Sequence, residues 1–107
     1  MSAGIEVERC PACARHALPG RDFCPRCGGP VEVRTLPGEG EVVSAAEVHR
    51  APIPSPVGGP PFALALVRLD AAPEVVVMVA AAEPPAIGAA VEVRALEAPG
   101  RGPYGLA

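Results

Sequence analysis

The chain has 107 residues and a formal net charge of −3, with nine arginines, no lysine and no tryptophan. Half of its residues are hydrophobic but only 3% are aromatic, and valine, alanine and leucine suit strands but offer no surface for stacking nucleobases. Residues 37–107 hold four arginines against eight acidic residues, which disfavours binding to a phosphate backbone. The longest apolar run, residues 75–82, is too short to cross a bilayer. We therefore expect a cytoplasmic protein with no membrane partner.

All four cysteines fall in two Cys-Pro-x-Cys motifs that are separated by ten residues: Cys10, Cys13, Cys24 and Cys27. A two-residue gap lets the chain turn so that both sulfurs of a motif face one ion, and two such motifs are typical of a structural zinc site. Gly28 follows the second motif, where a left-handed backbone would point an N–H at a sulfur, and Ala14 takes the same place after the first. The spacing predicts a rubredoxin-like zinc ribbon over residues 1–36, with Zn²⁺ held by the four cysteines.

Other uses of the cysteines fit the sequence less well. No apolar secretory segment precedes residue 10, which argues against disulfides. A redox pair usually has one motif beside a βαβ unit, whereas this chain has two matched motifs. Iron in an electron carrier stays open, because tetrahedral sulfur suits iron as well as zinc.

The remaining pattern predicts an all-β protein. Residues 5–8 and 31–34 alternate between apolar and charged side chains, which favours two paired strands beside the metal. Residues 37–40 (Pro-Gly-Glu-Gly) mark a boundary, and residues 69–74 form a hairpin turn. Residues 84–88 suit a helical turn or an irregular crossover. Strands are expected in residues 42–48, 62–69, 75–79 and 91–95, with a weak one around Tyr104. This pattern predicts a small OB-fold barrel over residues 37–107.

Two strands and one loop carry further expectations. Phe62, Leu64 and Leu66 share one face of their strand, so we expect Phe62 in the core. Residues 75–79 are almost all valine, which predicts a fully buried strand. Residues 51–61 hold five prolines and two glycines, and form either a plain surface connection or a stiff arm that meets a partner or a ligand.

The order of these features resembles a known family. After the two motifs come Gly38-Glu39-Gly40-Glu41-Val42, a Val-His-Arg-Ala-Pro segment at residues 48–52, a Pro-Pro-Phe strand start at residues 60–62 and an Ile-Gly-x-x-Val turn at residues 87–91. This combination is similar to the accessory proteins with a zinc ribbon and an OB fold that accompany enzymes of acyl-CoA and lipid metabolism. Their partners include thiolases, hydroxymethylglutaryl-CoA synthase and enoyl-CoA hydratases.

The resemblance implies a non-catalytic subunit of a hetero-oligomer, which binds a thiolase-like or hydratase enzyme and helps to form its acyl-CoA channel. It implies that the loop of residues 49–62 faces the partner or CoA, with candidate contacts at His49, Arg50, Gly59 and Pro61. Arg50 beside His49 offers a cation for a CoA phosphate.

The residues also bear on catalysis directly. The chain lacks a Gly-x-Ser-x-Gly motif and a phosphate-binding Gly-x-x-x-x-Gly-Lys loop. His16, between the two motifs, is expected to be a solvated loop residue. We therefore predict that the protein is not an enzyme; the alternative function is a module that binds single-stranded nucleic acid.

Overall fold

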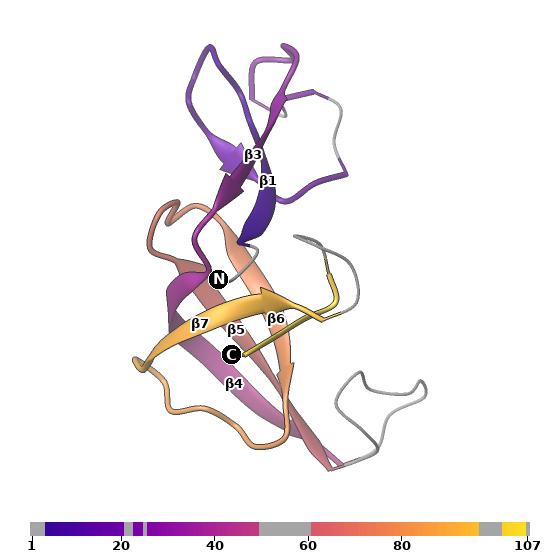
Figure 1. The fold of residues 1–107 in the computed structure, drawn as a ribbon, viewed down its shortest axis with the longest axis vertical. Coiled ribbons are helices and arrows are strands. Elements are labelled where there is room, and N and C mark those ends of the chain that lie inside the picture. The colour runs from indigo at the N-terminus through magenta and orange to yellow at the C-terminus, as the bar shows by residue number, and fades with distance from the viewer. Residues whose placement is uncertain (1–3, 21–22, 25, 50–60, 97–101, 107) are drawn as a thin grey trace.

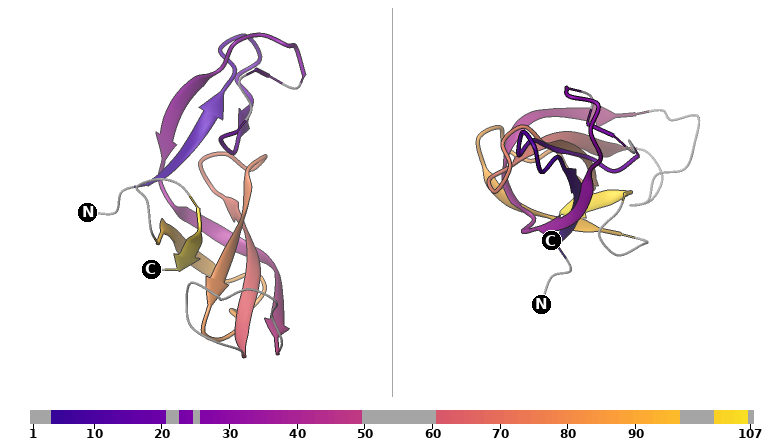
Figure 2. Two further views of the ribbon diagram at one scale, coloured as in Figure 1. Left: turned by 90° about the vertical axis from the view of Figure 1, so that its right-hand side faces the viewer. Right: turned by 90° about the horizontal axis from the view of Figure 1, so that it is seen from above.

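The computed structural model describes residues 4–20, 23–24, 26–49, 61–96 and 102–106, and these are all-β (Figure 1). The strands are β1 (Ile5–Arg9), β2 (His16–Ala17), β3 (Glu32–Leu36), β4 (Glu39–Val48), β5 (Phe62–Leu69), β6 (Val76–Ala81), β7 (Ala90–Ala95) and β8 (Tyr104–Leu106). Figure 2 shows the small sheet formed by the first three strands stacked on one end of the barrel. The described residues include no helix with the length and apolarity needed to cross a bilayer. The predicted fold class, a zinc ribbon followed by an OB barrel, is confirmed.

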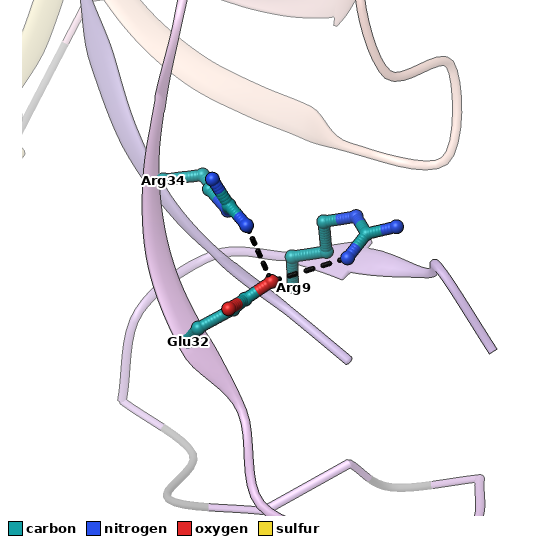
Figure 3. A network of polar contacts seen from close by, with 3 residues as sticks. All are labelled: Arg9, Glu32 and Arg34. Atoms are coloured by element: carbon teal, nitrogen blue, oxygen red, sulfur yellow. Dashed lines mark hydrogen bonds and ion pairs between the residues drawn. The ribbon is translucent and has the colours of Figure 1, made fainter. Parts of the chain in front are cut away.

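The ribbon is a three-stranded sheet in the order β2-β1-β3. β1 and β3 pair antiparallel from Ile5–Leu36 to Arg9–Glu32, so the two predicted strands do flank the cysteines. Glu32 accepts hydrogen bonds from Arg9 at 3.1 Å and from Arg34 at 2.7 Å (Figure 3). The bond from Arg34 is the main cause that lowers the pKa of Glu32. These side chains are solvent-exposed, so the network contributes little stability and mainly aligns the end of the strand pair.

The barrel closes in the order β4-β5-β6-β8-β7. β4 pairs with β5 along most of its length and with β7 near its start, and a bulge at residue 43 shifts its register between Val42 and Ser44. A bulge adds local twist, which lets one long strand serve both neighbours. β8 lies parallel to β6 and antiparallel to β7, so the predicted weak final strand does close the barrel. Residues 84–88 form the predicted irregular crossover, whose Gly88 N–H donates to the carbonyl of Val42 at 2.8 Å.

The small side chains of β5 face the interior of the barrel. Ala63, Ala65 and Val67 are buried, whereas Leu64 is half-buried and Leu66 is 39% exposed. Leu69, on the same side of β5, is also fully buried, so the narrow barrel takes small residues at one end of β5 and a larger one at the other. Phe62 is buried as predicted, although its neighbours of the same parity are not.

The prediction that residues 75–79 form a fully buried strand is wrong. Val77 and Val79 are buried, but Val76 is 39% and Met78 is 59% exposed. Each strand of a closed barrel has one side that faces the core and one that faces solvent. A run of β-branched residues has no alternation to show which side chains lie on which side. The side chains of β6 therefore alternate between buried and exposed, as those of β5 do.

The ribbon and the barrel share one hydrophobic core. Ile5 and Val7 of β1 are fully buried and belong to the same cluster as Val42, Val77 and Val93 of the barrel. Two further ribbon residues, Leu18 and Leu36, pack against this cluster. The apolar side of the ribbon is thus covered by the barrel.

A polar contact also ties the ribbon to the barrel. Glu74, in the turn between β5 and β6, accepts a hydrogen bond from the backbone N–H of His16 at 2.9 Å, and its Oε2 lies 3.1 Å from Nδ1 of the same histidine. The expectation that His16 is a solvated loop residue is wrong, because its side chain is largely covered and paired. Burial alone would raise the pKa of Glu74, but the hydrogen bonds from His16 lower it below its ordinary value.

Replacement of Glu74 by alanine is expected to loosen the ribbon without unfolding the barrel. The N–H of His16 loses its charged acceptor, which costs about 1 kcal/mol at a partly exposed site. Because the pKa of Glu74 is lowered in the folded protein, its contribution is present at pH 7 and is lost as the pH falls through that pKa. Urea unfolding and amide hydrogen exchange at pH 7 measure the effect. Exchange at His16 should accelerate about fivefold, and an unchanged rate would contradict the contact.

Candidate metal centre

The four cysteine sulfurs converge on one point. Their Sγ atoms all lie within 4.8 Å of one another, with Cys10 and Cys27 3.4 Å apart and Cys13 and Cys24 3.6 Å apart. A tetrahedral zinc ion with Zn–S bonds of about 2.3 Å separates its sulfurs by about 3.8 Å. All four cysteines are free thiols. The donor set therefore fits one tetrahedral metal ion such as zinc.

The two motifs fold into the same turn. The N–H of Ala14 donates to the carbonyl of Cys10 at 2.7 Å, and the N–H of Gly28 donates to the carbonyl of Cys24 at 2.8 Å. Both donors have left-handed backbones, with φ of 60° at Ala14 and 74° at Gly28. Glycine adopts this conformation freely and alanine does so at a cost. The left-handed backbone predicted at Gly28 is present, and Ala14 adopts it as well, but the N–H of Gly28 donates to the carbonyl of Cys24 rather than to a sulfur.

Backbone N–H groups stabilise thiolates at the first cysteine of each motif. Hydrogen bonds from the N–H groups of Cys27 and Arg26 lower the pKa of Cys24 to about 6. A hydrogen bond from the N–H of Cys13 is the main cause that lowers the pKa of Cys10. Cys27 is the second cysteine of its motif. A hydrogen bond from the N–H of Gly29 lowers its pKa, but the neighbouring thiols outweigh this effect and raise the pKa to about 11. A metal ion binds thiolates, so these donors favour the bound state of the site.

Two of the four sulfurs are buried beside a small hollow, while Cys13 and Cys27 are exposed. Cys10 and Cys24 are buried and line a hollow of about 20 Å³, which is the space of one water molecule. Four sulfur donors already complete a tetrahedral shell, whereas catalytic zinc sites keep one position open. The arrangement is suited to a structural role.

Replacement of Ala14 by glycine is expected to stabilise the ribbon by about 0.5–1 kcal/mol, because glycine removes the strain of an L-residue in the left-handed region. Competition with a zinc chelator should show tighter metal retention than in the wild type. The opposite change, Gly28→Ala, is the matched control and should cost a similar amount. Weaker retention in Ala14→Gly would show that the turn is not strained.

Of the residues expected to face a partner or CoA, His49 and Pro61 lie at the end of the barrel away from the ribbon, where β4 ends and β5 begins. His49 is 71% exposed and its Nε2 lies 2.8 Å from Oε1 of Glu47, while Pro61 is exposed at the start of β5. Arg50 and Gly59 lie outside the described residues, as does most of the proline-rich loop. A role of this loop in binding CoA or a partner stays a prediction.

A groove that the sequence did not predict lies where the ribbon meets the barrel. It has a volume of about 610 Å³ and is lined by residues 15–20 of the ribbon and by Glu74, Val75 and Val76 of the barrel. Its two walls are about 55 residues apart in the chain, and no local pattern joins them. The acidic and histidine side chains that meet there carried no sequence signal.

Comparisons with known proteins identify the family. A family model described as the C-terminal OB-fold domain of ChsH2 matches residues 33–96. The chain belongs to this family. The resemblance to OB-fold accessory proteins is thereby confirmed for the fold and the family. The association with acyl-CoA enzymes stays a prediction.

Two solved structures are similar over nearly the whole chain. One, described as "Ltp2-ChsH2(DUF35) aldolase", has 28% identity and a TM-score of 0.69 over 94% of this chain and 81% of that chain. Another, a DUF35 protein of unknown function from Sulfolobus solfataricus, has 20% identity and a TM-score of 0.67 over 95% and 73% of the two chains. At that identity the second likeness shows the fold alone. A comparison with curated proteins finds no match.

Proposed function

We propose that this protein is a non-catalytic accessory subunit, which binds an enzyme acting on acyl-CoA substrates and helps to form the channel for the acyl-CoA. The partner is a thiolase-like or hydratase enzyme, and the assembly is a hetero-oligomer. Within it, Zn²⁺ is held by Cys10, Cys13, Cys24 and Cys27 as a structural ion.

The observation that carries this proposal is the likeness to the solved Ltp2–ChsH2 aldolase, which extends over ribbon and barrel together. The chemistry of the chain supports it. The four thiols form a closed donor set, and each of the two histidines pairs with a glutamate rather than with a nucleophile.

The alternative, binding of single-stranded nucleic acid, has less support. Stacking needs exposed aromatic rings on a basic surface. In the barrel, Phe62 is buried and Tyr104 is half-buried, and a groove beside β7 is lined by Glu39, Asp70 and Glu92. These acidic groups repel a phosphate backbone.

The proposal is tested by capturing the partner enzyme from cells and then rebuilding the complex from the two purified proteins. A tagged copy, expressed in its own cells, is purified with its partner, which is identified by mass. The identified enzyme is then produced separately and mixed with the pure protein. We expect a defined complex by gel filtration with light scattering, and higher activity or solubility of the enzyme.

Titration of the isolated protein and of the complex with CoA then tests the channel. The complex should bind CoA more tightly than either part alone. If no purified acyl-CoA enzyme forms a complex, the proposal is wrong. Tight, salt-sensitive binding of a single-stranded oligonucleotide would instead favour the alternative.

A further inference from the structure

The outer side of the barrel carries a largely apolar surface over β4, β5 and β6, in which Ser44 is the polar neighbour of Leu66. Residues that face each other in adjacent antiparallel strands share a side of the sheet, and Leu66 faces Ser44 on one side and Met78 on the other. Leu64 lies next to Ala46 in the same way. We call this surface, made of Ala46, Leu64, Leu66, Val76 and Met78, the outer apolar face.

No free charge interrupts this face among the described residues. Arg68 lies between Glu41 and Val76 in the row of the face nearest the groove, and its guanidinium pairs with Glu41 at 2.7 Å. The chain carries a net charge of −3, and acidic side chains gather in the groove beside β7. The leucine, valine and methionine side chains of the outer apolar face carry no charge. Within the face itself, the only cation among the described residues is Arg68, whose charge Glu41 balances, so a phosphate backbone or an anionic lipid surface gains little there. The matching surface is an apolar patch on a protein.

The face continues into the groove between ribbon and barrel, because Val76 belongs to both. Three strands spaced about 4.8 Å apart and five residues long give a planar footprint of roughly 240 Å². A stable protein interface covers about 800 Å² on each partner. The face alone is therefore too small, and the groove supplies additional contact area next to it.

One wall of that groove carries a cation. Arg15 lines the groove and makes no ion pair with the described residues. A partner that fills the groove can therefore place a carboxylate opposite Arg15 while its apolar part covers Met78 and Leu66. Methionine adapts its shape to a partner, and it is common at such surfaces.

We infer that the enzyme subunit of the complex docks across the outer apolar face and into the ribbon–barrel groove, with an uncharged apolar patch that has an acidic group at its edge. This inference rests on the proposed function and locates its interface. It assigns the interface to the wall of the barrel rather than to the proline-rich loop alone. The contact of His16 with Glu74 then holds the two halves of one docking surface in register.

The experiment measures the affinity of the reconstituted enzyme for variants of the face. Met78→Glu and Val76→Glu each place a charge in the apolar interface and should raise the Kd at least 30-fold. Met78→Arg should do the same, which shows that burial of a charge rather than its sign is responsible. Val33→Glu is the matched control, since Val33 is 61% exposed on β3, at the far edge of the ribbon sheet, and its Kd should change less than threefold.

The possible outcomes separate this inference from the function on which it rests. If the wild type binds the enzyme and all face variants bind like Val33→Glu, the docking face is wrong and the proposed function stands. If the wild type binds no purified acyl-CoA enzyme, both fail. If the isolated wild type is a dimer by light scattering and Met78→Glu is a monomer, the face serves self-association and the inference is overturned. Circular dichroism and zinc content verify that each variant is folded.

Discussion

Replacement of Cys24 by serine is expected to unfold the ribbon and to destabilise the barrel below it. Structural zinc contributes about 10–16 kcal/mol to the folding of small zinc peptides at pH 7. Whole domains are stable by only about 5–15 kcal/mol. A ribbon of some thirty residues cannot bury enough apolar surface to replace that contribution.

The barrel is affected because its core extends into the ribbon. Ile5 and Val7 are fully buried against the barrel, and each such side chain contributes about 1.5–3 kcal/mol when it is buried. Once β1 detaches, the covered end of the barrel is exposed to water. We therefore expect aggregation and a lower Tm for the barrel as well as loss of the metal.

Metal content, far-UV circular dichroism and thermal unfolding measure these effects, and chelation of the metal from the wild type should reproduce them. Ala12→Ser is the matched control, because Ala12 is exposed between two ligands and supplies no sulfur. The ribbon interpretation fails if Cys24→Ser keeps one zinc ion and a native spectrum. The same samples identify the metal: a colourless protein with one zinc supports the structural site, and a red protein with visible absorption supports iron.

The parts of the fold that depend on local spacing could be predicted from the sequence. Both sulfurs of a Cys-Pro-x-Cys motif are positioned by a single turn, so the convergence of the four cysteines follows from two local geometries and one strand pair. The alternation at residues 5–8 and 31–34 likewise fixes which side chains of each strand share a face. The number of strands in the barrel and the hairpin of β5 and β6 followed from the number and spacing of the apolar segments.

The parts that depend on long-range pairing could not be predicted. The side of β5 that faces inward is set by the width of the closed barrel, which places Ala63 and Ala65 inside and Leu66 outside. Met78 becomes part of an exposed surface only because the register sets it beside Leu66. Glu74 and His16 are 58 residues apart, and neither residue signals the other in the sequence. Such contacts are decided by the fold as a whole.

Gly38 is also fixed by such a long-range contact, and its replacement by alanine is expected to cost about 3 kcal/mol. Gly38 lies in the short link between β3 and β4, and its carbonyl accepts a hydrogen bond from the N–H of Val93 at 2.8 Å. A Cβ at this position would collide with the carbonyl oxygen of Val93 and would lie 3.1 Å from its carbonyl carbon. The obstacle is backbone, which cannot rotate away as a side chain would.

Relief of this collision must move either the link or β7. Val93 is buried in the shared core, so a shift of β7 disturbs the packing around it, and a shift of the link changes how the ribbon is joined to the barrel. For a domain of about 100 residues, 3 kcal/mol corresponds to a fall in Tm of roughly 12–24 °C. Thermal and urea unfolding of the zinc-loaded protein measure it.

Gly28→Ala is the control for Gly38→Ala. It introduces backbone strain without a collision, so the difference between the two variants measures the collision. Gly28 has φ of 74° but no atom within 4 Å of an added Cβ, and the equivalent Ala14 shows that the turn accepts alanine. The cost there should be about 1 kcal/mol. If Gly38→Ala were as mild as Gly28→Ala, the link would not be packed against β7, and the ribbon would be free to move relative to the barrel. A larger cost at Gly38 would mean that ribbon and barrel form one rigid unit, as a docking surface that spans both requires.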